Sequence, residues 1–531
     1  MAYDVIVIGS GFGGAITGCR LAEAGYKVLI LERGRRWDKS NYPRKPEDNW
    51  IWNGDCPEKK NGWMELHTFR HMTVAQGAAV GGGSLIYANI SCEAPQSAFA
   101  AGWPAEVTYT ELKPYYDEVA RFMNVQPVPD NQWTKRMELM RDGANAIGAG
   151  NRFKKLELAV SFDPQWNYGL PNCHDASHSK PFTNAQGVAQ GTCVHLGNCD
   201  IGCDVDARNT LDRNYIPWAE KHGAEVRELH LVTNIEPIDS GYKVYFDQLA
   251  NGQRTAGNET ARIVIVAASS LGSTELLLRC RDLTKTLPNV SSFLGRDWSS
   301  NGDFLTPAFY SNPERDVLPS SGPTITCAID FLDRSESGQS FWIEDGGFPN
   351  LIRDYINGLR SGANSGGLWA RMIIEAFGHM LRDQDGQAFR NVMPWFAQGV
   401  DAANGVLSLD RNPITGKSTL SLDWEIERSK PVMETIIAMH KKLSAATHGD
   451  PVVPPTWTLL NYLVTPHPLG GCCMGTSAAN GVVNHAGEVF GYKNLYVADA
   501  AIIPEALGVN PSRTIGALAE RVAKIIRDEA R

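Results

Sequence analysis

The sequence has no apolar run of membrane-spanning length, which excludes a transmembrane helix at the level of the sequence. We also expect no secretory leader. A stretch typical of a buried strand begins at about Tyr3, which leaves no room for a basic region and a cleavage site. These two absences predict a cytoplasmic protein without a transmembrane segment.

Runs of basic residues are missing as well. The chain has 50 Lys and Arg against 59 Asp and Glu, a formal net charge of -9. Binding to nucleic acid or to an anionic membrane needs clustered positive charge, which this sequence does not offer. We therefore expect no nucleic-acid partner.

The cysteines show no disulfide framework. There are 11 of them, an odd number in a chain expected to be cytoplasmic, so they are interpreted as thiols or ligands. Cys193, Cys199 and Cys203 form C-x5-C-x3-C, which could hold an iron–sulfur cluster, although the spacing is not that of the standard ferredoxins. The Cys-x2-Cys pair typical of zinc sites is absent. Structural thiols are the favoured interpretation, and an iron–sulfur or other metal site stays open.

The strongest positive signal is the stretch from Tyr3 to Glu32. An apolar run at Val5 to Ile8 predicts a strand buried on both faces, and a glycine-rich turn and a helical pattern follow it. A second apolar strand ends on Glu32, roughly twenty residues past the glycines, where an acid can accept from ribose hydroxyls. Strand, G-x-G-x-x-G turn, helix, strand and terminal acid together predict a dinucleotide site that uses Gly9, Gly11 and Gly14.

A second glycine cluster lies at Gly77 to Ile90 and contains three consecutive glycines. Such a cluster costs chain entropy, so we expect a close backbone approach there. A third buried strand at Ile263 to Ala267 and a last one at Leu495 to Ala498 predict that distant segments pair in one sheet. Asp499 then lies at a strand's carboxyl end, where ligands of open α/β sheets bind.

The fold class that follows is α/β, with a discontinuous Rossmann-type domain and an α+β substrate domain with a largely antiparallel sheet. Between about Asp130 and Gln190 the pattern shows no clear period, as expected of a cap over a pocket. The predicted dinucleotide domain comprises residues 1–40, 72–100, 192–303 and 463–531, and the predicted cap comprises residues 41–71, 101–191 and 304–462.

Six ordered motifs carry a resemblance that spans essentially the whole chain. They are GSGFGG, AVGGGS, VAASSLGSTELLL, N-G-D at Asn301 to Asp303, HPLGGC, and NLYVADAAIIP with GVNPSRTI. Together they resemble the glucose–methanol–choline (GMC) flavoprotein oxidoreductases, and most of all their cholesterol oxidase branch. The resemblance implies FAD as cofactor and oxidation of an alcohol to a carbonyl by hydride transfer to flavin N5.

The resemblance also implies roles for particular residues. His467 and Asn510 would face the flavin and the substrate alcohol as the catalytic pair. Histidine titrates near neutral pH and suits the hydroxyl proton, and an asparagine amide can donate to a developing oxyanion. Residues implied to bind FAD are Gly9, Gly11, Gly14, Glu32, Gly83, Ser84, Tyr87, Asn89, Val232, Asp499, Asn510 and Ser512.

The expected substrate is a bulky, apolar secondary alcohol such as a sterol, with oxygen or another electron acceptor. Isomerising cholesterol oxidases use a glutamate base, and Asn391 to Val400, the matching stretch, has no Glu, so we expect no coupled isomerisation. The alternative within the family is a sugar or glycoside dehydrogenase that passes electrons to an acceptor other than oxygen, possibly through a cluster at the three cysteines. An NAD-dependent dehydrogenase fits the first motif alone and is disfavoured by the second glycine cluster and HPLGG.

Overall fold

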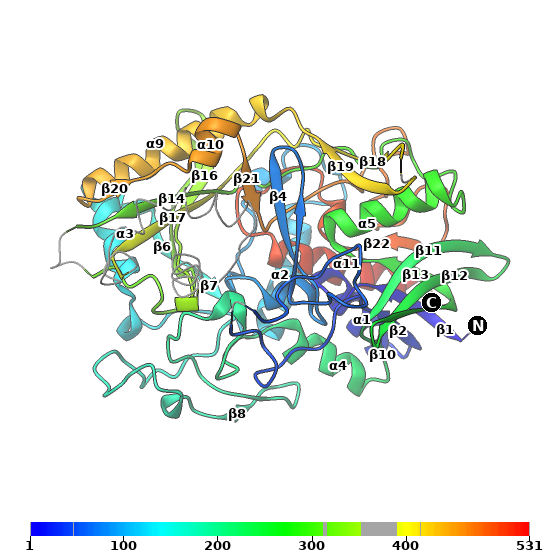
Figure 1. Cartoon of the computed structure of the whole chain (residues 1–531), viewed down its shortest axis with the longest axis horizontal. Coiled ribbons are helices and arrows are strands. Elements are labelled where there is room, and N and C mark those ends of the chain that lie inside the picture. The colour runs from blue at the N-terminus through cyan, green and yellow to red at the C-terminus, as the bar shows by residue number, and fades with distance from the viewer. Residues whose placement is uncertain (1, 46, 312–315, 352–389, 415, 530–531) are drawn as a thin grey trace.

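The computed structural model describes residues 2–45, 47–311, 316–351, 390–414 and 416–529. Two large sheets lie at opposite sides of the molecule, and a small sheet that includes β4 and β21 lies between them (Figure 1). Residues 352–389 of the predicted cap lie outside the described residues. The predicted domain boundaries stay a prediction.

The first large sheet is the predicted dinucleotide-binding sheet. Its order is β10-β2-β1-β13-β12-β11, with β22 pairing with β13. Its parallel part joins segments from the start, middle and end of the chain, which produces the discontinuity expected from the sequence. The strands are β1 (Tyr3–Ile8), β2 (Val28–Leu31), β10 (Glu225–Arg227), β11 (His230–Ile238), β12 (Gly241–Ala250), β13 (Gln253–Val266) and β22 (Leu495–Val497).

Helices pack beside this sheet and against one another. Helix α1 (Phe12–Glu23) follows the first glycine turn and packs against α11 (Ser512–Glu529), which in turn contacts α2 (Tyr109–Phe122). The Thr108 hydroxyl caps α2 by accepting from the Glu111 amide. Two further helices are α4 (Tyr215–Lys221), which contacts α1, and α5 (Ser269–Leu278), which follows β13.

The second large sheet is antiparallel throughout its described pairs, as predicted. Its order is β20-β14-β17-β16-β15-β6, and helix α9 (Lys430–Ala446) packs on β14, β16 and β17. Apolar residues of β17 and α9 are fully buried between them. The strands are β6 (Phe153–Lys155), β14 (Phe304–Phe309), β15 (Cys327–Glu336), β16 (Gln339–Asp345), β17 (Val392–Gly399) and β20 (Asp450–Pro451).

Helix α3 (Lys135–Ala146) lies in the region where the sequence shows no clear period. Its Arg136 is fully buried and donates to the carbonyls of Thr324, Asp345, Ser321 and Pro323. A buried arginine interrupts the apolar stripe of the helix, which hides the helical period. Thr134 caps the helix by accepting from the Met137 amide.

The remaining elements are small. Among them, β21 pairs with β4 and ends two residues before His467. The small central sheet therefore positions that histidine between the two large sheets. No helix in the described part of the chain has the length and hydropathy that a membrane crossing needs. The cytoplasmic location stays a prediction. These elements are β3 (Met64–Thr68), β4 (Met72–Gly77), β5 (Gln126–Pro127), β7 (Glu157–Leu158), β8 (Phe182–Thr183), β9 (Ala189–Gln190), β18 (Val406–Arg411), β19 (Ser418–Asp423), α10 (Pro455–Leu460) and β21 (Leu463–Thr465).

Candidate active site

A cavity of about 1100 Å³ extends from the first glycine turn to His467. Its walls come from the carboxyl ends of parallel strands, the second glycine cluster, the start of α11, and the cap strands β14 and β17. Gly14, Ser84 and Asn89 are not among its lining residues. The sequence-predicted residues that line it are Gly9, Gly11, Glu32, Gly83, Tyr87, Val232, His467, Asp499, Asn510 and Ser512.

The glycines of the first turn differ in what surrounds them. A Cβ at Gly14 would lie 2.0 Å from the carbonyl oxygen of Gly9, so only glycine lets α1 pack so closely on the turn. A Cβ at Gly11 would meet only the Cα of Gly82, at 4.0 Å. Gly11 also lines the cavity. The amides that begin α1 therefore face a space that an anion can enter.

The second glycine cluster packs directly on the first. Gly82 has φ +52°, and a Cβ there would lie 2.6 Å from the Cα of Gly11. The close backbone approach predicted from three consecutive glycines is therefore confirmed. A Cβ at Gly83 would meet nothing within 4 Å, which leaves this side of the turn open to the cavity.

Glu32 connects the two glycine turns. Its carboxylate accepts from the backbone amide and the hydroxyl of Ser10 at 2.9 and 2.7 Å, and the Ser10 Oγ accepts from the Gly81 amide at 3.0 Å. Its other oxygen accepts from the Gly34 amide at 2.8 Å. Glu32 is buried and also borders the cavity. Its carboxylate thus holds the two glycine turns together and forms part of the cavity wall.

Ser84 and Asn89 support the second turn from behind. Arg208, which is buried, donates to the Ser84 carbonyl at 2.6 Å and to Asn89 Oδ1 at 2.8 Å. The Ser84 hydroxyl accepts from the Leu211 amide at 3.1 Å. The structure therefore brings these two residues to the back of the glycine turn and Tyr87 to the cavity itself.

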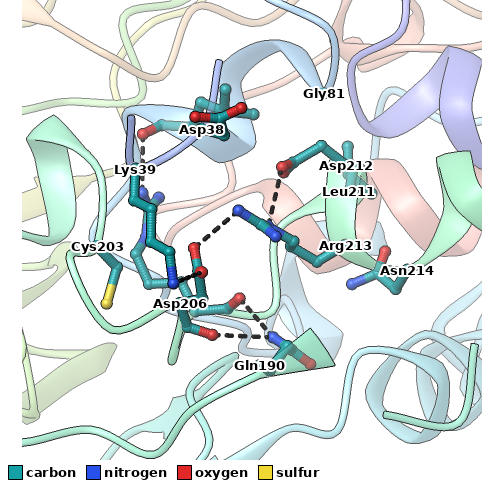
Figure 2. A network of polar contacts seen from close by, with 12 residues as sticks. Asp38, Lys39, Gly81, Gln190, Cys203, Asp206, Leu211, Asp212, Arg213 and Asn214 are labelled. Carbon is teal, nitrogen blue, oxygen red and sulfur yellow. Dashed lines mark hydrogen bonds and ion pairs between the residues drawn. The ribbon is translucent and has the colours of Figure 1, made fainter. Parts of the chain in front are cut away.

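The segment that Ser84 contacts is held by an ion-pair network. Figure 2 shows Arg213 between Asp206 and Asp212, with N–O distances of 2.7 and 3.3 Å, and Lys39 reaching Asp206 at 3.4 Å. Burial raises the pKa of Asp212, and the Arg213 charge opposes this rise. The network connects the loop after Cys203 to the segment that follows β2. It thereby fixes the position of Leu211, whose amide donates to Ser84 in the second glycine turn.

Cys193, Cys199 and Cys203, for which the sequence favoured structural thiols and left a metal site open, can be examined in the structure. Among the described residues, no group of three or more His, Cys, Asp or Glu is placed to hold a metal ion. Cys193 Sγ accepts from the His195 amide and Cys203 Sγ from the Ala207 amide. Burial raises the pKa of Cys199 to about 11. The geometry favours structural thiols.

Replacing Cys199 by Ser tests this interpretation. We expect the visible spectrum of the purified protein to be unchanged, because a buried thiol that binds no metal contributes no visible absorbance. The measurement is an absorption spectrum with iron analysis on anaerobically purified protein. Bound iron in the unmodified protein, with absorbance that the variant loses, would instead establish a cluster.

Asp499 follows β22 and lies at the edge of the cavity. Its carboxyl accepts from the Ser269 amide, the Ser273 hydroxyl and the Ala501 amide. Burial raises the pKa of Asp499 to about 6, and these hydrogen bonds oppose the rise. The carboxyl therefore joins the ends of β13 and β22, as expected for a residue at the carboxyl edge of the sheet.

His467 is paired with an acid for which sequence reasoning found no role. Its Nδ1 lies 2.9 and 3.0 Å from the two carboxylate oxygens of Asp303, which is fully buried. Thr465 fixes the pair, because its hydroxyl contacts Asp303 and accepts from the His467 amide. Burial raises the pKa of Asp303, and the neighbouring His467 opposes this rise. With Asp303 ionised, a neutral His467 carries its proton on Nδ1 and keeps Nε2 as an acceptor.

Asn510 borders the same cavity at the start of α11. Its side chain is buried, and its Oδ1 has no hydrogen-bond partner. Its backbone carbonyl accepts from the Cys92 thiol. A buried amide oxygen without a partner at a cavity wall is typical of a site completed by a bound group or by a proton.

An apolar wall faces His467. Strands β14 and β17 pair so that Leu305 lies opposite Phe396 and Pro307 opposite Pro394, and these four residues with Val392 line the cavity. Because side chains of a strand alternate between its faces, the five share one face of the two-stranded ladder. The Phe396 ring lies 6.4 Å from the His467 ring, centroid to centroid.

Comparison with known proteins matches this architecture. Residues 3–169 match the N-terminal model of the GMC oxidoreductases, and residues 402–519 match the C-terminal one. The cholesterol oxidase of Acinetobacter baumannii is 32% identical over 540 residues, which cover 99% of this chain and 94% of that protein. The chain belongs to the GMC oxidoreductase family.

Two further proteins are similar to this chain in sequence or in fold. A 2-methyl-1,2-propanediol dehydrogenase of Mycolicibacterium austroafricanum is 25% identical, with 98% of this chain and 95% of that protein covered. The formate oxidase of Aspergillus oryzae, in a structure titled for its FAD modification, superposes with a TM-score of 0.64 at 14% identity, covering 99% of this chain and 98% of that one. This GMC oxidoreductase is an FAD-dependent enzyme that acts on alcohols.

Proposed function

We propose that this enzyme oxidises the hydroxyl of a bulky, apolar secondary alcohol of the sterol type, a 3-hydroxysteroid, to a ketone. The observation that carries the proposal is the apolar ladder of β14 and β17 beside the His467–Asp303 pair. A fused-ring hydrocarbon buries its surface against such a wall, with a gain of about 25 cal/mol for each Å² of apolar surface removed from water. The similarity to a cholesterol oxidase supports the same substrate class.

The cavity offers FAD a continuous set of contacts. In this proposal the glycine turn of Gly9, Gly11 and Gly14 receives the pyrophosphate at the start of α1, and Glu32 and Val232 receive the adenosine. The open sides of Gly11 and Gly83 and the unpartnered Asn510 Oδ1 support the fit, because each leaves room or hydrogen-bonding capacity for a bound group. The remaining proposed contacts are those of Tyr87, Asp499 and Ser512, with Ser84 and Asn89 acting through the second turn.

The chemistry assigned to the protein is proton transfer and charge stabilisation. Bound FAD supplies the two-electron acceptor for the alcohol carbon. His467 takes the hydroxyl proton of the substrate on Nε2, and Asp303 stabilises the imidazolium that results. Asn510 donates to the substrate oxygen as negative charge develops there, and the amides at the start of α11 stabilise an anion beside them.

A sugar substrate is disfavoured by the same wall. Sugar hydroxyls need hydrogen-bond partners, and the five cavity-facing side chains of β14 and β17 carry none. The same five include no carboxyl, which supports oxidation without isomerisation of the steroid ring. The electron acceptor in this proposal is oxygen or another small acceptor.

A substrate panel tests the proposal. Equal concentrations of a 3-hydroxysteroid, a long-chain primary alcohol and a sugar are offered to the holoenzyme, and turnover is followed with oxygen and with an artificial dye. We expect the steroid to give the highest kcat/KM with at least one acceptor. A sugar that exceeds the steroid would overturn the substrate assignment, while colourless, inactive protein would overturn the function as a whole.

Glu32→Ala should weaken FAD binding by about 10- to 100-fold. Hydrogen bonds to a charged group contribute about 1.5–3 kcal/mol, and here the same carboxylate also holds Ser10 and thereby the second glycine turn. The measurement is flavin occupancy of the purified protein, followed by titration of the apoprotein with FAD.

Glu138→Ala is the matched control, because Glu138 pairs only at the surface with Lys135 on α3. We expect full flavin occupancy in this control. Full occupancy in Glu32→Ala as well would contradict the role assigned to Glu32.

A further inference from the structure

A buried carboxyl group lies beside Asn510 but does not line the cavity. Glu344 is on β16, and its side chain is fully buried. In the antiparallel ladder Glu344 lies opposite Phe396, the residue of β17 that reaches the cavity next to His467. The Asn510 side chain is among the hydrogen-bonding neighbours of the Glu344 carboxyl. Glu344 therefore touches the back of a proposed catalytic residue rather than the substrate space.

The neighbours of Glu344 fix the direction of hydrogen bonding. The Trp342 indole N–H, which can only donate, contacts Gln398 Oε1. The Gln398 amide must then present Nε2, which donates to Glu344 Oε2 at 3.0 Å. Trp342 lies opposite Gln398 in the strand register, so the sheet itself holds this arrangement. One Glu344 oxygen is thus committed as an acceptor.

The second carboxyl oxygen of Glu344 and the side-chain oxygen of Asn510 each lack a hydrogen-bond partner. Glu344 Oε1 and Asn510 Oδ1 are both buried without a hydrogen-bond partner. The two ends of an asparagine amide have nearly the same shape, so hydrogen bonding decides which end faces its neighbour. A proton on Glu344 with Asn510 Oδ1 turned toward it pairs both atoms at once.

The charges around Glu344 also favour its neutral form. The charged groups that act on it are Asp345 and Asp303, both carboxyls and both buried. The basic groups nearest to these two carboxyls pair with them and not with Glu344: Arg136 lies 3.9 Å from Asp345, and His467 pairs with Asp303. Burial raises the pKa of Glu344 well above its usual range, and hydrogen bonds from Gln398 and Asn510 oppose this rise.

One more titratable group acts on the same carboxyl, the thiol of Cys92. Burial raises the pKa of Cys92 to about 12, so this thiol stays neutral. Lys154 and Arg513 act on Cys92, but each is paired with an acid, Asp330 and Glu157 respectively. Among the residues that the structure describes, these two cations are therefore already engaged and do not offset an ionised Glu344.

We propose that Glu344 is a positioning residue that stays protonated and donates to Asn510 Oδ1, so that Asn510 Nδ2–H is presented to the substrate oxygen. The chain of donors runs from Trp342 through Gln398 and Glu344 to Asn510. The inference rests on the proposed function in one respect, the role of Asn510 as a donor in alcohol oxidation.

The test compares Glu344→Gln with Glu344→Leu in the holoenzyme. Glutamine imitates the protonated acid, because its Oε1 accepts from Gln398 and its Nε2–H donates to Asn510. We expect Glu344→Gln to keep kcat within about twofold of the unmodified enzyme, and Glu344→Leu, which cannot donate, to lose about tenfold in kcat with little change in KM. Glu336→Gln on β15 is the matched surface control, with no change expected.

The pH dependence separates positioning from mere packing. The donating form of Glu344 exists below its pKa, so kcat of the unmodified enzyme should fall as the pH rises through that value. Glu344→Gln should not show this alkaline fall, because an amide does not titrate. A loss in Glu344→Gln as large as in Glu344→Leu, or unchanged kcat in Glu344→Leu, would overturn the proposal.

Infrared spectroscopy gives a readout that needs no substrate. The unmodified protein at neutral pH should show the carbonyl stretch of a neutral carboxylic acid that is missing from Glu344→Gln. Absence of such a band would overturn the proposal even if the enzyme oxidises alcohols. Presence of the band in a protein that oxidises no alcohol would support protonated Glu344 and reject the proposed function instead.

Discussion

His467→Ala should retain its bound flavin and lose about 100- to 10,000-fold in kcat. General base catalysis contributes about that factor, and His467 is the residue on the cavity wall whose free ring nitrogen is proposed to take the substrate proton. Because the proposed FAD contacts lie mainly on the glycine turns and the parallel strands, the flavin spectrum should remain. The measurement is steady-state turnover of the steroid together with flavin content.

His178→Ala is the control for that result, since His178 does not line the cavity and its side chain bonds to the Pro171 carbonyl. Turnover of the control should equal that of the unmodified enzyme. If His467→Ala turned over substrate at the unmodified rate, the assignment of the base would be wrong.

Asp303→Asn should lower kcat by about 100- to 10,000-fold without loss of fold or flavin. An asparagine can turn its amide N–H toward His467 Nδ1, and the ring then carries its proton on Nε2 and cannot accept the substrate proton. The side chain keeps its size, and Thr465 can still hydrogen-bond to the amide. The measurement is kcat and its solvent isotope dependence, with thermal unfolding as a check on the fold.

Asp401→Asn provides a comparison for Asp303→Asn. Asp401 is also buried and accepts from Ser299 and Ser300 at 2.7–2.8 Å, but it does not contact His467. It should cost stability and leave kcat of the folded enzyme nearly unchanged. Equal losses of kcat in the two variants would show that Asp303 acts through packing alone.

Local patterns made the dinucleotide-binding part predictable from sequence. The turn from β1 into α1, the second strand with Glu32, and the close approach of the second glycine cluster depend on neighbours in the chain and on glycine sterics. The largely antiparallel cap sheet was predicted from strand-like runs between Phe304 and Tyr462, together with a helix that the structure has as α9. The residues assigned to FAD were taken from a family resemblance, and their roles stay predictions.

Long-range pairs could not be predicted in this way. Asp303 and His467 are 164 positions apart, and Glu344 and Gln398 are 54 apart. Their contacts depend on the register of strands and on where β21 ends, which no local pattern encodes. The sequence places an acid after Asn301-Gly302, yet nothing in that motif says which side chain the acid meets.

Helix α3 shows a different reason for a missed element. Its buried Arg136 satisfies four backbone carbonyls of the segment 321–345, so a charged residue occupies a core position. Periodicity treats arginine as a surface residue and therefore loses the helical signal. The fold tolerates the charge because the guanidinium donates to four backbone carbonyls in the interior.

The central claim is that a sterol alcohol reduces FAD bound in this cavity, with His467 as the base. The most direct measurement mixes the purified holoenzyme with a 3-hydroxysteroid in the absence of oxygen and follows the flavin absorbance in a stopped-flow instrument. We predict rapid bleaching of the flavin bands, formation of the ketone in a one-to-one ratio to flavin, and a rate at least 100-fold lower in His467→Ala. Flavin that stays oxidised with the steroid, or bleaching at the same rate in His467→Ala, would contradict the account.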